Sequence, residues 1–221
     1  MSEFENLSYE ELKKKHEAGN NEPELLWRLA ESCYRKANAL DAKDTNGKKT
    51  FILEGREFGR KAVEQCPEGN IQVLKWAAIL TGTSTDYLGT KERIEQAYVL
   101  KGLLDKAIAL NGNDSTLLHL RGRYAFGIAN LSWLERKAAS AFFATPPEAT
   151  IDEALADFVA CHAIRPDFIE NNVYAARCLI SKKEYEKAVN FMNEALALPA
   201  DDENEKALQE EARGLIKKYG K

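Results

Sequence analysis

Residues that break helices are scarce in this sequence, with 13 Gly and 6 Pro among 221 residues. Because breaks are rare, the chain can form many uninterrupted helices. The sequence also lacks an apolar run of the roughly 18 to 20 residues that a membrane-spanning helix needs. Its acidic N-terminus, MSEFENLSYEEL, lacks the basic-then-apolar order of a signal peptide. We therefore expect a soluble, cytoplasmic protein with no membrane segment in this chain.

An excess of positive charge is also missing. The sequence holds 31 Lys and Arg against 35 Asp and Glu, which gives a formal net charge of -4. A general nucleic-acid binder would usually be basic, because it must neutralise phosphates. We therefore expect no nucleic acid among the partners.

Motifs for catalysis and for metal binding are absent. The cysteines are scattered without a C-x-x-C pair, and the three histidines are isolated. The segment AKDTNGKKT at residues 42–50 ends like a phosphate-binding loop but lacks the first glycine of such a loop. We expect no catalytic residue, no cofactor and no metal site, and we expect the cysteines to be small buried apolar residues. They are Cys33, Cys66, Cys161 and Cys178.

Helical periodicity runs from end to end, with apolar residues at three- and four-residue steps. Patterns such as Ser8-x-x-Glu11 and Thr150-x-x-Glu153 are typical of helix starts. The sequence therefore predicts an all-α protein. The expected helices lie near residues 8–18, 23–40, 50–66, 70–82, 90–111, 114–130, 132–143, 150–164, 167–181, 183–197 and 202–218.

Small and large residues recur at a fixed spacing in the second helix of successive pairs. The tetratricopeptide repeat, about 34 residues long, has a small, an aromatic and a second small residue at steps of four and three before a closing proline. Ala154, Phe158 and Cys161 hold these places before Pro166, and Gly122 holds the small position of the preceding first helix. The same spacing recurs, with substitutions, within residues 55–67, 100–112 and 188–199.

These matches predict antiparallel helix pairs stacked as a tetratricopeptide-like (TPR) α-solenoid with insertions and a C-terminal capping helix. The alternative is an irregular helical bundle in which the matches arise by chance. We expect a short helix and linker at 1–22 and a repeat domain at 23–221. The expected repeats span about 23–68, 69–113, 114–166 and 167–200, followed by the capping helix at 202–218.

Basic side chains are the candidate partner-binding residues, because the first helices of such pairs line an extended concave surface. Several arginines there would invert the sign of an acidic protein locally, and guanidinium groups bind carboxylates in bidentate geometry. An acidic peptide is the predicted ligand. The alternative is that these arginines pair with glutamates of neighbouring helices. The candidates on the repeat helices are Arg28, Arg35, His119, Arg121, Arg123 and Arg177.

An insertion at residues 131–150 adds a helix within the third repeat. It exposes Arg136 and Lys137 on its first turn, and these complete the candidate partner-binding residues. We interpret Trp133 and the two phenylalanines of the insertion as anchors that attach this helix to the array.

The same insertion carries the order W-x-x-R-K-x-x-x-x-F-x-A-T-P-P, from Trp133 to Pro147. In this block, and over about residues 25–215, the chain resembles the regulator of microtubule dynamics family. The resemblance implies a TPR-like helical protein associated with microtubules, spindle poles and chromosome segregation. It supplies no catalytic motif.

The resemblance and the charge pattern lead to one expected mechanism. The microtubule surface is strongly negative and bears flexible acidic tails, so we expect tubulin to be bound by the arginine-lined surface. Other spindle or cytoskeletal proteins are further expected partners, and the expected location is the cytoskeleton, spindle and spindle poles. The alternative is an adaptor that binds an acidic peptide of another regulator and reaches microtubules through it. The polar face of the helix at 202–218 favours capping, so we expect a monomer.

Overall fold

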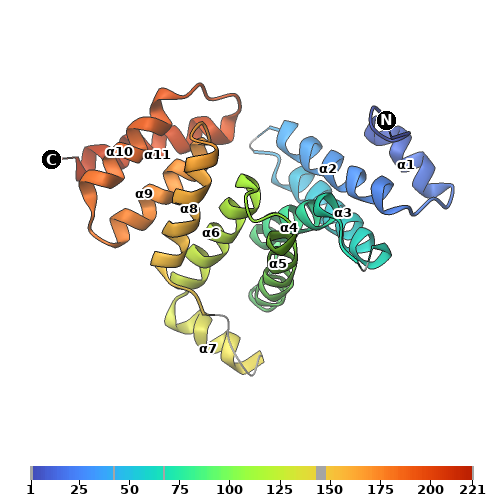
Figure 1. Ribbon diagram of the computed structural model, residues 1–221, viewed down its shortest axis with the longest axis horizontal. Helices are drawn as coiled ribbons and strands as arrows, with labels where there is room; N and C mark the ends of the chain where they lie inside the picture. Colours follow the sequence, from blue (N-terminus) through green and yellow to red (C-terminus); the bar gives the residue numbers. More distant parts are fainter. Residues whose placement is uncertain (1, 42, 67, 143–147, 221) are drawn as a thin grey trace. The chain divides into compact units, whose positions relative to one another are not determined.

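The chain folds into helices throughout the part that the computed structural model describes, which is residues 2–41, 43–66, 68–142 and 148–220. These residues contain no strand, so the predicted all-α class is confirmed (Figure 1). None of their helices combines the length and the apolar character that crossing a membrane requires. The chain divides into two compact units, Met1–Asn111 and Gly112–Lys221, at the junction of the second and third expected repeats.

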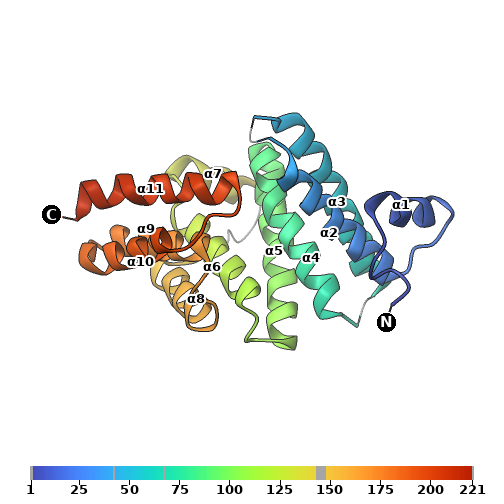
Figure 2. The ribbon, with the colours of Figure 1, turned by 90° about the horizontal axis from the view of Figure 1, so that it is seen from above.

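The first unit holds five α-helices and a single turn of 3-10 helix among its described residues. α2 packs against α3 and α4, and α4 packs in turn against α3 and α5 (Figures 1 and 2). Glycines permit close approaches here, because a Cβ atom on Gly55 would lie 2.8 Å from the Cβ of Cys33, and one on Gly59 would lie 3.0 Å from the Cα of Ala77. The elements are α1 (Tyr9–Glu17), α2 (Pro23–Ala39), α3 (Thr45–Gln65), α4 (Ile71–Ser84), η1 (Thr85–Tyr87) and α5 (Thr90–Leu110).

A polar cluster attaches α1 to the repeat helices. The Glu54 carboxylate on α3 accepts hydrogen bonds from the Tyr9 hydroxyl at 2.8 Å and from Lys13 Nζ at 2.6 Å. Lys36 on α2 pairs with Glu10 at 2.7 Å. Burial, with the Glu54 charge adding to it, raises the pKa of Tyr9 to about 12, so its hydroxyl stays protonated and donates. The N-terminal helix is therefore packed into the first unit.

Replacing Glu54 with alanine is expected to loosen α1, since Tyr9 and Lys13 both lose their acceptor. The expected cost is about 1 to 2 kcal/mol of local stability. Hydrogen exchange at the backbone amides of α1 measures it, and exchange should be faster. Glu57→Ala is the matched control, because Glu57 lies on the same helix and pairs with the exposed Arg60. Equal exchange in the two variants would remove the anchoring role of Glu54.

The second unit holds six α-helices in its described residues. α6 packs against α8 and α8 against α9, while α9, α10 and α11 all pack against one another (Figures 1 and 2). α7 extends beyond the ends of α6 and α8 (Figure 1). The elements are α6 (Ser115–Ala129), α7 (Trp133–Phe142), α8 (Ile151–Ile164), α9 (Ile169–Ser181), α10 (Tyr185–Ala197) and α11 (Glu203–Tyr219).

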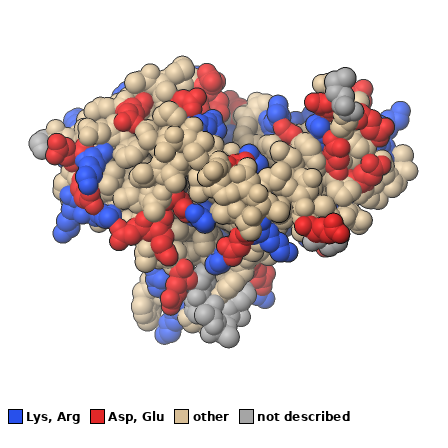
Figure 3. Space-filling model, viewed as in Figure 1, with Lys and Arg blue, Asp and Glu red and all other residues tan. Residues whose placement is uncertain are grey.

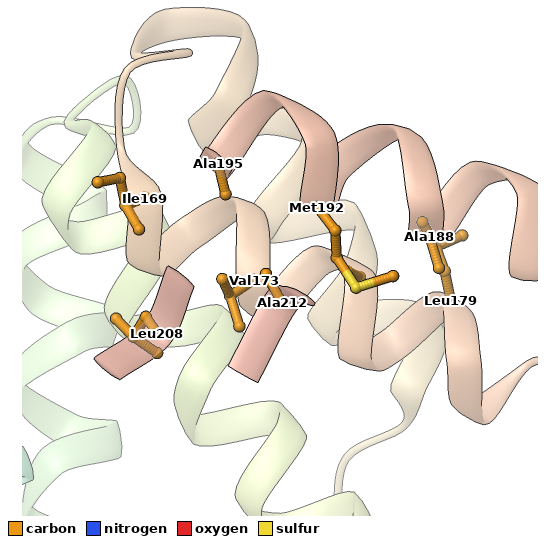
Figure 4. Close-up of a cluster of buried hydrophobic side chains, with 9 residues drawn as sticks. Ile169, Val173, Leu179, Ala188, Met192, Ala195, Leu208 and Ala212 are labelled. Carbon is orange, nitrogen blue, oxygen red and sulfur yellow. The ribbon is translucent and has the colours of Figure 1, made fainter. Parts of the chain in front are cut away.

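Side chains at the expected repeat positions form the core of the second unit. Phe158 of α8 is fully buried and lies directly over Gly122 of α6. Apolar side chains of the last three helices meet in a second cluster, where Met192 of α10 is also fully buried (Figure 4). Burial of apolar side chains between the helices is the main stabilising contribution in such stacked pairs. The cluster comprises Ile169, Val173, Ala176, Leu179, Ala188, Met192, Ala195, Leu208 and Ala212.

The two capping boxes named from the sequence form as predicted, and the predicted start of one helix is wrong. Ser8 and Thr150 each form the predicted capping box, with Glu11 and Glu153. The helix expected from residue 50 is wrong at its start: α3 begins five residues earlier, because the Asp44 side chain accepts from the Gly47 N–H at 2.9 Å. Some features named from the sequence lie outside the described residues: Pro67 at the end of the first repeat pattern, Phe143, and the prolines that end the insertion motif, Pro146 and Pro147.

The four cysteines are free thiols, and three of them are fully buried. Burial raises the pKa of Cys33 and of Cys178 to about 12, and that of Cys161 to about 11. The thiols are therefore protonated at neutral pH, and these three side chains are part of the apolar core as predicted. Cys66 is half-buried.

Candidate functional site

Two arginines on neighbouring helices of the second unit lie close to the ring of one tyrosine. Tyr174 of α9 has the Arg177 guanidinium 4.4 Å from its ring centroid and the Arg123 guanidinium of α6 at 5.2 Å. Phe126 packs edge-on against the same ring at 5.6 Å. Guanidinium groups are attracted to the face of an aromatic ring, so the tyrosine holds both cations close together.

Each arginine also pairs with a glutamate of a different helix. Arg123 Nη1 donates to Glu170 Oε1 at 2.8 Å. Arg177 binds Glu211 of α11 in a bidentate pair, with Nε and Nη2 donating at 2.8 and 2.6 Å. We call the set of Arg123, Glu170, Tyr174, Arg177 and Glu211 the Tyr174 surface. Two arginines and two glutamates leave it balanced in charge, so the interhelical pairing considered from the sequence is present here.

His119 lies beneath this surface. Its side chain is only 3% exposed, its Nδ1 is 3.2 Å from the Asn171 Oδ1, and its Nε2 is 3.5 Å from Glu170 Oε2. A partner cannot reach it directly, so the prediction that His119 contacts a ligand is wrong. Burial would raise the pKa of Glu170, but His119 and the charges of Arg123 and Arg177 together lower it to about 2.

Arg121 joins α6 to α8 within one helix pair. Its Nε and Nη2 donate to the two carboxylate oxygens of Asp157 at 2.8 and 2.6 Å. The Asp157 side chain is nearly buried, at 10% exposed, while that of Arg121 is 40% exposed. A bidentate pair to a buried carboxylate fixes the orientation of both groups. Arg121 is therefore placed apart from the Tyr174 surface and contributes to packing.

Arg28 and Arg35 belong to the first unit, on α2. Arg28 pairs with Glu24 at 3.0 Å and stacks over the Trp27 ring at 4.5 Å. Arg35 pairs with Glu31 at 2.6 Å, and its side chain is 75% exposed. Exposed pairs of this kind are weak, so Arg35 can exchange its partner at little cost. Both residues belong to the first unit, whereas the Tyr174 surface belongs to the second.

The two basic residues of α7 have separate contacts. Arg136 donates to the backbone carbonyls of Ile128, Ala129 and Leu131 at 3.1, 2.9 and 3.2 Å, which fixes the start of α7 to the end of α6. Lys137 Nζ lies 4.8 Å from the ring centroid of Trp133. Trp133 itself is 72% exposed, so its interpretation as an anchor for this helix is wrong.

Sequence reasoning missed three of the five residues of the Tyr174 surface. Glu170, Tyr174 and Arg177 lie at positions i, i+4 and i+7 of α9, so they share one face of the helix. That spacing is a signal that could have found Glu170 and Tyr174. No comparable signal pointed to Glu211, because it lies on another helix, 34 residues after its partner Arg177.

Charge on the visible face of the molecule is mixed. Lys and Arg alternate with Asp and Glu on the face of each unit that Figure 3 shows, with uncharged surface between them. Within the described ranges, no three His, Cys, Asp or Glu side chains gather as the ligands of a metal ion would. At the Tyr174 surface the guanidinium groups of Arg123 and Arg177 bind carboxylates of the chain itself.

Stacked helix pairs with a charged and aromatic surface define a class: a tetratricopeptide-like helical repeat protein, typical of protein-interaction scaffolds. A solved structure of a thermophilic TPR protein from Thermus thermophilus is similar to this chain, with a TM-score of 0.59. Its identity is 14%, and the match covers 93% of this chain and 88% of that protein. At that identity the likeness shows the fold, and it confirms the predicted TPR-like class.

Sequence comparison shows the family. The family model described as regulator of microtubule dynamics protein 1-3 matches residues 1–220. Regulator of microtubule dynamics protein 1 of Caenorhabditis elegans is 40% identical over 209 residues, covering 95% of this chain and 91% of the relative. The Bos taurus protein of that name is 34% identical over 90% of this chain and 63% of its own length. The chain belongs to the regulator of microtubule dynamics 1-3 family, as its resemblance predicted.

Proposed function

We propose that this chain regulates microtubule dynamics as a non-catalytic protein that binds tubulin in the microtubule through the Tyr174 surface. The observation that carries the proposal is the placement of two guanidinium groups at 4.4 and 5.2 Å from the ring centroid of Tyr174. Membership of the family supports the link to microtubule dynamics. In this proposal the chain acts in the cytoplasm at the cytoskeleton and spindle, in spindle organisation and chromosome segregation.

The proposed mechanism is exchange of carboxylates. Glu170 and Glu211 hold Arg123 and Arg177 in fixed positions before a partner arrives. Carboxylates of an acidic tubulin segment then share or replace these contacts, and the ordered arginines lose little conformational freedom on binding. Salt weakens these contacts between guanidinium groups and carboxylates, because exposed charges are screened beyond about 8 Å at physiological ionic strength.

The double variant Arg123→Glu, Arg177→Glu tests this mechanism. We expect microtubule affinity to fall by about tenfold or more, because both cations become repulsive anions. The measurement is co-sedimentation of the purified protein with stabilised microtubules. A second variant with Gln at both positions removes the charges without adding repulsion, and it should also bind weakly.

The matched control is Arg60→Glu, Arg213→Glu, which makes the same change in net charge. Both control residues are exposed and pair only with nearby glutamates of their own helices among the contacts resolved here. Helical content and melting temperature show whether each variant is folded. If the Gln variant is folded and binds microtubules as tightly as the wild type, the Tyr174 surface is not the binding site.

An adaptor is the second candidate function. The same surface would then bind an acidic peptide of another regulator, and the chain would reach microtubules only through it. The TPR-like fold favours this candidate, since stacked helix pairs are common peptide-binding scaffolds. Co-sedimentation with pure microtubules distinguishes the two candidate functions. If the protein pellets with microtubules and this depends on their acidic tails, the result supports direct binding of tubulin. Failure to pellet at low and at high salt, with intact and with protease-trimmed tails, supports the adaptor.

A further inference from the structure

The start of α7 is held firmly in place. Ser132 and Glu135 form a reciprocal capping box, with the Ser132 N–H donating to Glu135 Oε2 at 2.9 Å and the Glu135 N–H donating to Ser132 Oγ at 3.3 Å. Arg136 adds hydrogen bonds to the last carbonyls of α6, among them that of Ala129 at 2.9 Å. Two independent sets of contacts therefore fix the first turn of this helix.

Two large apolar side chains lie in solvent on this fixed turn. Trp133 is 72% exposed and Leu134 is 69% exposed, the two highest values among the exposed large apolar residues that the structure describes. They are neighbours in sequence and contribute nothing to either buried cluster of the second unit. Exposed aromatic and aliphatic side chains on a rigid element are typical of the centre of a protein interface.

We propose that Trp133 and Leu134 form an apolar contact with the same acidic protein partner that the Tyr174 surface binds. This inference rests on the proposed function and adds a second, uncharged part to its binding surface. The partner must present apolar side chains that can cover the Trp133 indole and the Leu134 side chain.

Charge around the apolar pair points to this acidic partner. Lys137 lies over the Trp133 ring at 4.8 Å, and Arg136 is on the same turn. The single acid in the sequence of α7 is Glu135, whose carboxylate accepts from the Ser132 N–H and hydroxyl. The pair thus has one cation against it and a second on the same turn, and a partner that covers it gains most if carboxylates border its own apolar patch.

Both parts of the surface are carried by one continuous piece of structure. Arg123 is six residues before Ala129 on α6, which corresponds to about 9 Å along a helix axis. The Arg136 hydrogen bonds then join the end of α6 to the turn that bears Trp133. The Tyr174 surface and the apolar pair are therefore both attached to α6, and in this proposal one extended acidic segment, at about 3.3 Å per residue, contacts them together.

The test is the double variant Trp133→Ser, Leu134→Ser, compared with Val99→Ser, Leu110→Ser. The control residues are also large, apolar and exposed, at 48% and 55%, but they lie on α5 of the first unit. Co-sedimentation with pure microtubules is measured at several salt concentrations. We expect the α7 variant to bind about tenfold more weakly or worse, and the control variant to bind like the wild type.

The salt dependence of the affinity distinguishes the apolar contact from the charged one. Loss of an uncharged contact lowers affinity equally at every salt concentration, so the salt dependence of the α7 variant should match that of the wild type. Arg123→Gln, Arg177→Gln should instead reduce the salt dependence. Because Trp133 and Leu134 are exposed, the α7 variant should melt at the wild-type temperature.

Several outcomes would overturn the inference, and they can be told apart. Wild-type protein that never pellets contradicts the proposed function, and this inference falls with it. Wild-type pelleting that the α7 variant retains in full contradicts the inference alone. If the α7 variant keeps its microtubule binding but loses binding to anionic phosphatidylserine vesicles, Trp133 and Leu134 contact a lipid surface instead. If the α7 variant differs from the wild type only in the molar mass measured by light scattering, Trp133 and Leu134 serve self-association.

Discussion

Replacing Gly122 with alanine is expected to lower the free energy of unfolding of the second unit by about 1 to 3 kcal/mol. A Cβ atom at this position would lie 2.7 Å from the Cε1 atom and 2.9 Å from the Cδ1 atom of the Phe158 ring. Phe158 is fully buried, so its ring cannot move aside without disturbing the packing of α8. The clash outweighs the gain of about 1 kcal/mol that alanine normally brings to a helix interior.

The same helix supplies the control. Gly127 also lies within α6, but a Cβ atom added there would meet nothing within 4 Å. Gly127→Ala should therefore raise stability by about 0.5 to 1 kcal/mol. Chemical denaturation measures both variants, and the two changes should have opposite signs. Equal stabilisation by both would contradict the close approach of α6 and α8. Adding Phe158→Leu to Gly122→Ala should recover part of the loss, since the smaller side chain relieves the contact.

Replacing Glu170 with glutamine is expected to cost about 2 kcal/mol near neutral pH and to cost little at pH 2. The pKa of Glu170 is about 2 in the folded chain, below its ordinary value of 4.5. A carboxyl group whose pKa falls on folding stabilises the native state above its unfolded pKa, and that stabilisation is lost as pH falls through the folded pKa. The full shift corresponds to about 3 kcal/mol, reduced here because the side chain is 23% exposed.

Urea denaturation at pH 6, 4 and 2.5 measures this effect. The difference in stability between wild type and the Glu170 variant should shrink over that range. Glu210→Gln is the control: Glu210 is 73% exposed and pairs with Arg213 on its own helix. Its difference from wild type should be small at every pH. A constant cost for Glu170→Gln from pH 6 to 2.5 would mean that the carboxylate charge does not contribute, and that the side chain acts only by packing.

The parts of the fold that follow from local spacing could be predicted from the sequence. Gly122 and Phe158 were placed by the repeat pattern, because a small residue opposite a large one is required wherever paired helices approach closely. The capping boxes at Ser8 and Thr150 involve residues only three positions apart, so their partners are visible in sequence. The start of α3 was missed because its polar first turn has no apolar periodicity.

The candidate site depended on contacts that no local pattern encodes. Arg123 and Arg177 were found as exposed cations, but their partners lie 47 and 34 residues away on other helices. An arginine in a sequence gives the same signal whether it meets a glutamate of its own chain or a partner. Trp133 was misjudged for a similar reason: an aromatic residue in a helical pattern is more often buried, and its exposure depends on where α7 lies.

Packing between helices that follow one another has a consequence for how the protein is made. In the first unit, α2 meets α3 and α4, and α4 meets α5, so each contact joins segments close in the chain. Such contacts close short loops and form quickly. All helices of that unit belong to residues 1–111. A nascent chain can therefore complete its first unit while the ribosome is still adding the residues that carry Tyr174, and the candidate binding surface is the last part to mature.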